Sequence, residues 1–367
     1  MKIFNKPQYN LFIIILLTNH IFAYTNSIYY ANIQILLNCD QSKAFCDKAN
    51  KAFNNVAAIV SNTFDFKVPI LVNASFVNLC ESFMRCPEGQ PKPIGAASPT
   101  RLIHLMDDDG VERLYPQALV KQFQLSKQPE FSYFDITAGF NSNNEIFWFR
   151  GDPEIKEDQV DFELVLVHEF LHGLGFTFSW DDYLNPDNPS ILTPSPSFFN
   201  YNTNSAVNGS FFFTGFQEYA LDKYLVLTHD NSSLNQITKN LNRFSNIQSN
   251  FTNIEEFTRV FAKSPQYFDA RKMFNYSTNR GTIAFRFPDN EENIIIETSL
   301  VPFRSGSSFS HLDFASFNNT KDFLMRIKAP RKVTLNNLTS VNGNDINYTN
   351  PIGPITIRML RTIGYVT

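Results

Sequence analysis

The chain has 367 residues, of which 43% are hydrophobic and 18% are charged, and its formal net charge at pH 7 is −4. This length and apolar content suffice for one large domain or two lobes around a buried core, so a disordered chain is not the expected state. The small negative charge and the lack of a long basic run argue against nucleic acid or an anionic membrane surface as a partner.

The first 23 residues predict a secretory signal peptide. Lys2 and Lys6 supply a basic start, the run Leu11–Leu17 is apolar, and Ala23 offers a small residue at the expected cleavage point. The run is well short of the roughly 20 apolar residues that a membrane span requires. We therefore expect a mature protein that begins at Tyr24, is secreted to the extracellular space and has no membrane span.

The cysteine content agrees with an oxidising compartment. An even number of cysteines in an exported chain favours two disulfides over free thiols, and the candidates are Cys39, Cys46, Cys80 and Cys86. Pairing of sequence neighbours is the most local of three possible connectivities, and the spacing does not choose among them. Eight Asn-x-Ser/Thr sequences, among them Asn73, Asn208, Asn250 and Asn337, would permit a glycoprotein without establishing one.

The N-terminal part of the chain alternates between strand and helix patterns. Ile28–Leu37 predicts a strand, and apolar positions from Phe45 to Val60 recur at helical spacing and predict a helix of about five turns. Val68–Val72 and Arg101–Met106 are further predicted strands. The acidic turn Asp107-Asp108-Asp109-Gly110 follows. It could hold calcium, but three adjacent carboxylates are too few for a full set of oxygen ligands, which favours a solvated turn.

Two more strands, Phe134–Phe140 and Glu145–Arg150, are predicted to pair and to lead into a buried helix. Most residues from Val160 to Leu171 are apolar, and Asp158 or Asp161 is a suitable N-terminal cap. Gly173 and Gly175 are expected to end the helix, because glycine adopts positive φ without strain. This order of elements predicts an α+β fold.

The buried helix contains His168-Glu169-Phe170-Leu171-His172, an HExxH sequence. Residues four apart share one helix face, so both imidazoles could bind one metal ion while Glu169 points toward the water on that ion. Catalytic zinc takes three protein ligands and a water, whose pKa it lowers toward neutrality. The pattern predicts one catalytic Zn²⁺ with Glu169 as the general base; the alternative is a buried helix whose histidines are satisfied by hydrogen bonds.

The C-terminal half begins with a stretch from 181 to 210 that is rich in Pro, Asn and Ser and predicts a long surface excursion. Five further elements are predicted after it: a short helix at Phe216–Leu227, helical pattern over Asn246–Phe274, strands at Thr282–Phe287 and Asn293–Leu300, and a terminal helix at Pro354–Ile363.

The third metal ligand has several candidates in this half. Glu218 and Asp222 lie four apart on the predicted short helix and could supply a carboxylate, although a solvated helix face is the commoner fate of such a pair. His229 lies in a polar turn, His104 precedes the motif, and His20 leaves with the signal peptide. His311 follows a segment rich in Gly and Ser, and Asp313 could orient it by hydrogen bonding. We rank His311 first and keep Asp222 and Glu218 as alternatives.

Three separate segments give the chain a resemblance to a known family. His172-Gly173-Leu174-Gly175-Phe176 resembles the metzincin zinc peptidases, although Phe178 stands where their compact form has a third histidine. The leishmanolysin-like branch places that histidine far downstream, before a Met-turn and a C-terminal helix. Ser310-His311-Leu312-Asp313, Leu324-Met325 and the end Ile363-Gly364-Tyr365 are similar in order, with Leu312 in place of the usual Trp. The resemblance covers about residues 130–367.

The resemblance implies a metzincin-like, two-lobed α+β zincin with the active-site helix between the lobes. Residues 24–176 would form an upper lobe containing a sheet, and residues 177–367 an irregular and helical lower lobe with a long insertion; together they would be one catalytic unit. His168, His172 and His311 would bind zinc, and Met325 would form an apolar floor beneath it. The alternative for Met325 is an ordinary core methionine.

These expectations together favour a secreted zinc metalloendopeptidase whose substrate is a protein or peptide. The main alternative is a secreted binding or adhesion protein that keeps a zincin scaffold without cleaving, because a fold does not fix a function. A zinc hydrolase that acts on a non-peptide bond is a third possibility.

Overall fold

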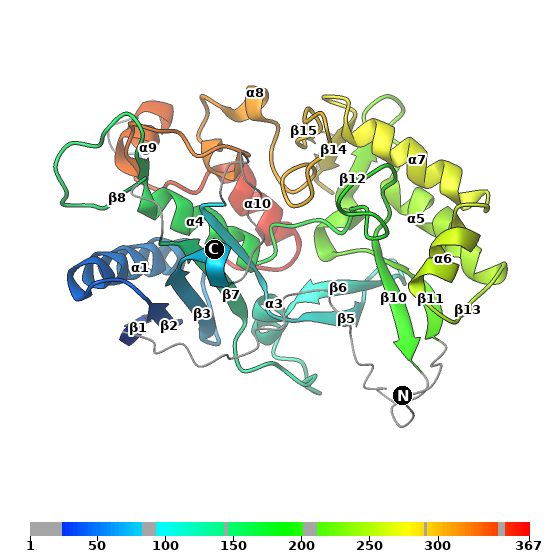
Figure 1. The fold of residues 1–367 in the computed structure, drawn as a ribbon, viewed down its shortest axis with the longest axis horizontal. Helices are drawn as coiled ribbons and strands as arrows, with labels where there is room; N and C mark the ends of the chain where they lie inside the picture. Colours follow the sequence, from blue (N-terminus) through cyan, green and yellow to red (C-terminus); the bar gives the residue numbers. More distant parts are fainter. Residues whose placement is uncertain (1–23, 83–92, 143–145, 201–210, 290–291, 344–348) are drawn as a thin grey trace. The chain divides into compact units, whose positions relative to one another are not determined.

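The computed structural model describes residues 24–82, 93–142, 146–200, 211–289, 292–343 and 349–367 (Figure 1). The predicted signal peptide, Cys86 and Asn208 lie outside the described residues. Within the described part of the chain, no helix is long and apolar enough to cross a membrane. The architecture is α+β, as predicted.

The chain divides into two compact units. Within the described residues, the first, here called the sheet unit, comprises residues 24–104, 115–176 and 314–367. The second, here called the insertion unit, comprises residues 105–114 and 177–313. The chain passes from the sheet unit to the insertion unit after residue 176. Residues 314–367, however, belong to the unit that contains the HExxH helix and not to the unit that follows it.

The sheet unit is built on five strands in the order β1-β2-β3-β7-β4. The central β2 (Ile33–Cys39), β3 (Ile70–Val77) and β7 (Ile136–Asn141) are parallel, and β1 (Tyr24–Tyr30) and β4 (Gly95–Pro99) are antiparallel edge strands. Every second residue along β2 and along most of β3 is buried, which is the pattern of a sheet with one face in a core.

The strand predicted at Ile28–Leu37 is in fact a hairpin, because Ala31 adopts a φ of 46° and reverses the chain between β1 and β2. The predicted pairing of Phe134–Phe140 with Glu145–Arg150 is also wrong. β7 pairs with β3 and β4, and the short β8 (Phe147–Trp148) pairs instead with β9 (Val160–Asp161).

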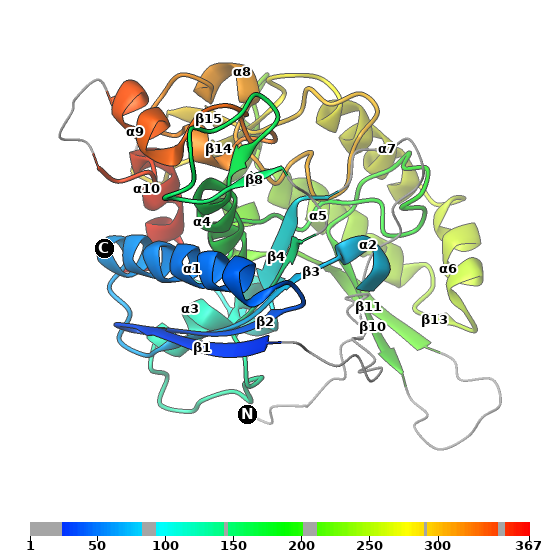
Figure 2. The same cartoon turned by 60° about the vertical axis from the view of Figure 1, so that its left-hand side comes forward.

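Helix α1 (Lys43–Thr63) confirms the predicted long helix; the side chain of Ser42 caps its first turn. The helix packs against α4 (Phe162–Gly173), and Figure 2 shows both helices over the same face of the sheet. Phe162, the first residue of α4, lies among Phe76 and Phe147 with ring centroids 5.1 and 4.8 Å away. This aromatic cluster anchors the start of the HExxH helix in the core.

The C-terminal segment of the sheet unit contains α8 (Phe314–Phe317), the 3₁₀ helix η3 (Phe323–Met325), α9 (Leu335–Gly343) and α10 (Pro354–Thr362). The last of these confirms the predicted terminal helix. Beyond α10, the hydroxyl of Tyr365 donates to the carbonyl of Leu174 at 2.8 Å, just past the end of α4. Such contacts explain why residues 314–367 group with the HExxH helix. The same unit holds α2 (Leu79–Ser82) and α3 (Gln117–Gln122).

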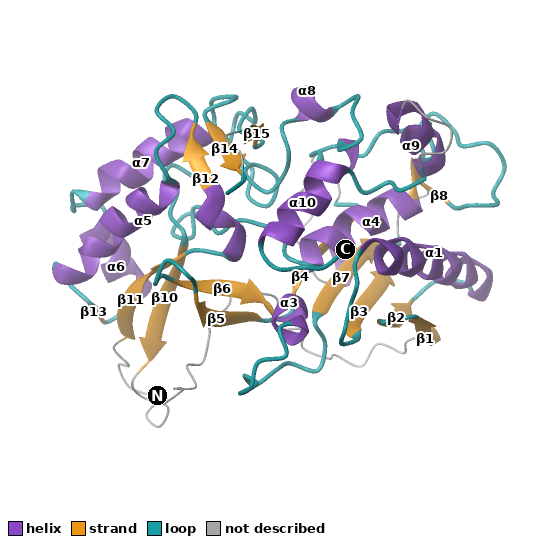
Figure 3. Cartoon of the chain, turned by 180° about the vertical axis from the view of Figure 1, so that it is seen from behind, coloured by secondary structure: helices purple, strands orange, loops and turns teal. Residues whose placement is uncertain are grey.

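In its described residues, the insertion unit has two small antiparallel sheets and three α-helices. Figure 3 colours strands orange and helices purple. One sheet contains β10 (Ser195–Asn200), β11 (Phe211–Gln217) and β13 (Asn250–Phe251); the other contains β12 (Leu225–Leu227), β14 (Ile283–Arg286) and β15 (Asn293–Ile295). The helices are α5 (Leu234–Asn242), α6 (Ile254–Phe261) and α7 (Gln266–Ser277), with the 3₁₀ helix η2 at Arg243–Asn246. The hairpin strands β5 (Leu102–Met106) and β6 (Glu112–Pro116) contribute residues to each unit.

The core of the insertion unit is aromatic. Five phenylalanines that are almost completely buried meet beneath the first sheet with ring centroids 5.0 to 6.1 Å apart, namely Phe213, Phe244, Phe251, Phe257 and Phe261. Residues 181–210 were predicted to form a long surface excursion. Part of this stretch is instead ordered in the core, because Ile191 and Leu192 are buried and Ser195–Asn200 forms β10. Asp182 accepts hydrogen bonds from the backbone of Leu184 and Ser190 and so orders this loop.

Candidate metal centre

Helix α4 carries the HExxH sequence, as predicted. Asp161 is its N-cap, and one carboxylate oxygen accepts a hydrogen bond from the backbone of Glu163 at 2.9 Å. Ten of the twelve residues of the helix are buried, and the two that are only partly buried are His168 and His172. The helix is therefore a core element whose two motif histidines are its only partly buried residues.

The chain leaves α4 through Gly175, which has a φ of +109°. A Cβ atom at this position would lie 2.6 Å from the side chain of Pro116, so a side chain is excluded by both conformation and space. The backbone N–H of Phe176 still bonds to the carbonyl of Leu171 at 2.9 Å. The glycine turn thus brings the carbonyl of Phe176 back beside the helix end.

Both motif histidines are oriented through Nδ1. The ring of His168 bonds through Nδ1 to the carbonyl of Leu324 at 2.8 Å, and the ring of His172 bonds through Nδ1 to the carbonyl of Phe176 at 2.7 Å. Because a carbonyl only accepts, Nδ1 carries the proton and the lone pair of each neutral ring is on Nε2. The two Nε2 atoms lie 3.1 Å apart. Sequence reasoning missed these backbone partners, since a carbonyl carries no residue signature.

The electrostatics of the pair favour neutral rings. Burial lowers the pKa of His168 to about 4. Burial, and then the neighbouring His168, lower the pKa of His172 to about 3. Both imidazoles are therefore uncharged at neutral pH, which is the state that binds a metal ion.

Glu169 lies on the same helix and is 8% exposed. Burial raises its pKa to about 8, against a hydrogen bond from the backbone of Ala97 in β4, which favours the ionised form. A cation close to this carboxylate would lower the pKa again, because it stabilises the charged form. The group is thus poised to exchange a proton near neutral pH.

Met325 is completely buried in η3, and η3 packs against α4. Its neighbour Leu324 supplies the carbonyl that holds His168. The Met325 turn therefore lies beside the HExxH helix within the same unit. The role of Met325 as an apolar floor beneath a metal ion stays a prediction.

His311 belongs to the insertion unit and is 5% exposed. Its Nδ1 bonds to the carbonyl of Ser307 at 2.8 Å, so its lone pair is also on Nε2. The backbone N–H of Glu297, two residues after the end of β15, donates to the carbonyl of His311 at 2.8 Å. This bond holds the segment around His311 beside the residues that follow β15. Asp313, which was predicted to orient His311, forms a bidentate ion pair with Arg280 at 2.8 Å.

The predicted helix at Phe216–Leu227 is wrong, and so is the solvated face assigned to it. The segment contains the end of β11, a 3₁₀ helix at Ala220–Tyr224 (η1) and β12. Glu218 is buried and bonds to Nε of Arg113 at 3.0 Å. Asp222 is buried and accepts from the backbone of Ser179 and Tyr219, and burial raises its pKa to about 7. Both carboxylates thus have structural partners in the insertion unit.

The acidic turn after β5 has carboxylate oxygens within 4.8 Å of one another. Arg113, which is not exposed, donates to Asp109 at 2.8 and 2.9 Å and to Asp107 at 3.1 Å. Lys223 pairs with Asp107 at 2.8 Å and also with Asp108. The turn is balanced by protein cations, so we assign it no metal.

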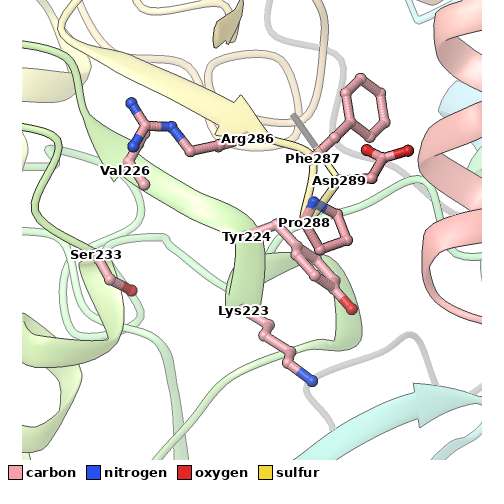
Figure 4. A pocket seen from close by; sticks show the side chains of 8 residues that line it. All are labelled: Lys223, Tyr224, Val226, Ser233, Arg286, Phe287, Pro288 and Asp289. Atoms are coloured by element: carbon pink, nitrogen blue, oxygen red, sulfur yellow. The ribbon is translucent and has the colours of Figure 1, made fainter. Parts of the chain in front are cut away.

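An open pocket of about 430 Å³ lies in the insertion unit, and Figure 4 shows the rings of Tyr224 and Pro288 together at its wall. Its cations already have partners: Lys223 binds the acidic turn, and Arg286 donates to Asn293 at 3.1 Å and to Asn231. None of the predicted metal ligands lines this pocket. It is separate from the candidate metal centre.

Cys39 and Cys46, the most local of the pairings that the sequence allows, form a disulfide that joins the end of β2 to the first turn of α1. Cys80 is also disulfide-bonded, whereas Cys86 lies outside the described residues. No free cysteine thiol occurs in the described ranges, so the candidate ligands there are nitrogen and oxygen atoms.

Comparison with known proteins gives a family but no activity. Residues 12–367 match the SPBPB7E8-like family, and the chain belongs to it. It is similar to the uncharacterized protein PB7E8.01 of Schizosaccharomyces pombe, with 28% identity over 374 residues that cover 95% of this chain. The chain spans 63% of the length of that relative. No solved structure matches the chain.

Proposed function

We propose that this protein is a zinc-dependent endopeptidase in which Glu169 activates the attacking water. The observation that carries the proposal is the pair of neutral histidines on α4, each held through Nδ1, with Nε2 atoms 3.1 Å apart beside a buried carboxylate. A helix that merely buried two histidines would not need both lone pairs to face each other at this distance. Two Nε2 lone pairs at this spacing suit binding to a single metal ion.

His311 is the third ligand in this proposal. His311 is buried and bonds through Nδ1 to the carbonyl of Ser307, so its lone pair is on Nε2, as in His168 and His172, which supports the assignment. The competing carboxylates are less suitable, because Glu218 bonds to Arg113 and Asp222 accepts backbone hydrogen bonds. Three neutral imidazoles suit Zn²⁺ and leave its fourth position for water.

The residues of the chain have separate roles in the proposed reaction. Bound zinc would polarise the substrate carbonyl and lower the pKa of water. The Glu169 carboxylate would take the proton from the attacking water and then give it to the leaving amine. Burial raises the pKa of Glu169, which makes the carboxylate a better acceptor for the first transfer. No covalent bond to the protein is required.

The wider context is part of the same proposal. The α+β architecture, the HExxH helix and the buried Met325 turn beside it support a metzincin-like zincin that resembles the leishmanolysin branch. The disulfide between Cys39 and Cys46 supports an oxidising, extracellular location. A protein or peptide is the proposed substrate.

The test is to express the chain through an oxidising pathway and measure its zinc content and its cleavage of casein-type substrates. We expect one zinc per chain and cleavage that a zinc chelator abolishes and added zinc restores. Cleavage that resists the chelator would contradict the zinc mechanism. Tight zinc binding without cleavage of a broad peptide library would favour the non-catalytic binding protein instead.

A further inference from the structure

Arg326 directly follows the Met325 turn and is only 5% exposed. Its Nε donates to the carbonyl of Phe323, and one terminal nitrogen donates to the carbonyl of Asn318 at 3.1 Å and to the side-chain oxygen of the same residue. All three acceptors are uncharged. Among the described residues, no carboxylate forms an ion pair with this guanidinium.

The side chain also lies between aromatic rings. The guanidinium carbon is 5.6 Å from the ring centroid of Phe314 and 5.8 Å from that of Phe323. These contacts offset part of the cost of burying a charge, but burial still lowers the pKa of Arg326 to about 10. A charge buried without a counter-ion is a poor way to gain stability, so its contacts need another explanation.

The contacts of Arg326 join two segments around one carbonyl group. Asn318 and Phe314 belong to the stretch that begins three residues after His311, whereas Phe323 belongs to η3. Leu324 follows Phe323, and its carbonyl is the partner of His168 Nδ1 at 2.8 Å. On the other side of η3, the carboxylate of Asp322 accepts from the backbone of Thr356 in α10 at 2.8 Å. The turn is therefore held from both ends.

We propose that Arg326 is a positioning residue that fixes the η3 turn so that the Leu324 carbonyl orients the imidazole of His168 for metal binding. The inference rests on the proposed zinc site, and it adds a residue that no sequence motif identifies. Arginine suits the role because its planar group donates in several fixed directions at once, which a lysine does not. Partners of this kind typically change metal affinity about 10- to 100-fold when they are lost.

The test uses the full chain with Arg326→Met and Arg326→Lys, and Arg361→Met in the exposed last turn of α10 as the matched control. Zinc affinity is measured by chelator competition well below the unfolding temperature. We expect both Arg326 variants to bind zinc about 10- to 100-fold more weakly than the wild type, and the control to match the wild type. In Arg326→Ala, added methylguanidinium should restore part of the lost affinity.

A second readout needs no metal. The proton on Nδ1 of His168 should give a protected nitrogen-bound NMR signal in the metal-free wild type, and that signal should be lost or exchange rapidly in Arg326→Lys. A purely structural role would lower the unfolding midpoint and leave zinc affinity and this signal unchanged, which would overturn the inference. A wild type that binds no zinc would instead overturn the proposed function, and the positioning role with it.

Discussion

At the scale of single residues, each histidine of the candidate centre is oriented by a backbone carbonyl. Leu324, Phe176 and Ser307 accept from Nδ1 of His168, His172 and His311, respectively. The spacing of the HExxH sequence predicted that two imidazoles share a helix face. It did not predict which nitrogen carries the proton, because that depends on carbonyl groups up to 156 residues away along the chain.

The first residue-scale prediction concerns Glu169. Glu169→Ala should keep stoichiometric zinc, since it removes no proposed ligand, and should lower kcat by about 10²- to 10⁴-fold, which is the usual contribution of a general base. Zinc content and steady-state kinetics measure the two effects. Glu157→Ala, which removes an exposed carboxylate, is the control and should behave as the wild type. Full activity in Glu169→Ala would show that another group is the base.

Another residue-scale prediction tests His311 as the third zinc ligand. His311→Ala should lose tight zinc, whereas folded Glu218→Ala and Asp222→Ala should keep one zinc per chain, because their carboxylates already have structural partners. His229→Ala, at an exposed histidine, is the matched control. Zinc per folded chain after dialysis is the measurement. Retention by His311→Ala together with loss in either carboxylate variant would replace the three-histidine site with a mixed one.

At the scale of elements, long patterns were predicted well and short ones were not. The periodic apolar positions of α1 and the capped, apolar α4 are consistent with helix over several turns, so the local sequence is enough. The segment Phe216–Leu227 is short, and polar residues such as Glu218 and Asp222 interrupt its apolar positions, so its pattern does not separate a strand from a helix. Its strands form because β10 pairs with the end of β11 and β14 pairs with β12, and both partners lie elsewhere in the chain.

The end of α4 gives an element-scale prediction. Gly175→Ala should lower the free energy of unfolding by at least about 2 kcal/mol, because the left-handed conformation and the contact with Pro116 both oppose a side chain. Gly151→Ala shares the positive φ but meets no atom within 4 Å, and it should cost only about 1–2 kcal/mol. Urea unfolding measures both. Equal effects would mean that the approach of Pro116 does not matter.

At the scale of the whole molecule, Asp161 connects segments 174 residues apart. One of its oxygens caps α4, and the other accepts from the backbone of Leu335 at 2.8 Å, at the start of α9. Burial raises the pKa of Asp161 from its ordinary 3.8 to about 6. The HExxH helix and the C-terminal helices are thus held together through a carboxylate that titrates within an accessible pH range.

This pKa shift predicts how stability changes with pH. The folded state holds the proton of Asp161 more tightly than the unfolded state, so this group's contribution to stability is greatest below pH 3.8 and falls as the pH rises to about 6. The loss is about 3 kcal/mol across that window. The difference in unfolding free energy between wild type and Asp161→Asn should follow this trend in urea titrations from pH 3.5 to about pH 7. A difference that is constant with pH would contradict it.

The sequence by itself determined the α+β class, the HExxH helix with its cap and glycine exit, the pairing partners Cys39 and Cys46 as a local option, and the terminal helix. Each depends on residues close together in the chain, where spacing and backbone preference act directly. Only the tertiary structure decided that residues 314–367 belong with the HExxH helix and that Glu218 and Asp222 have structural partners. It also decided that the Leu324 carbonyl bonds to His168 and that Arg326 bonds to the neighbouring Phe323 carbonyl. These contacts form between distant segments through backbone groups and buried charges, which leave no periodic or motif signal in the sequence.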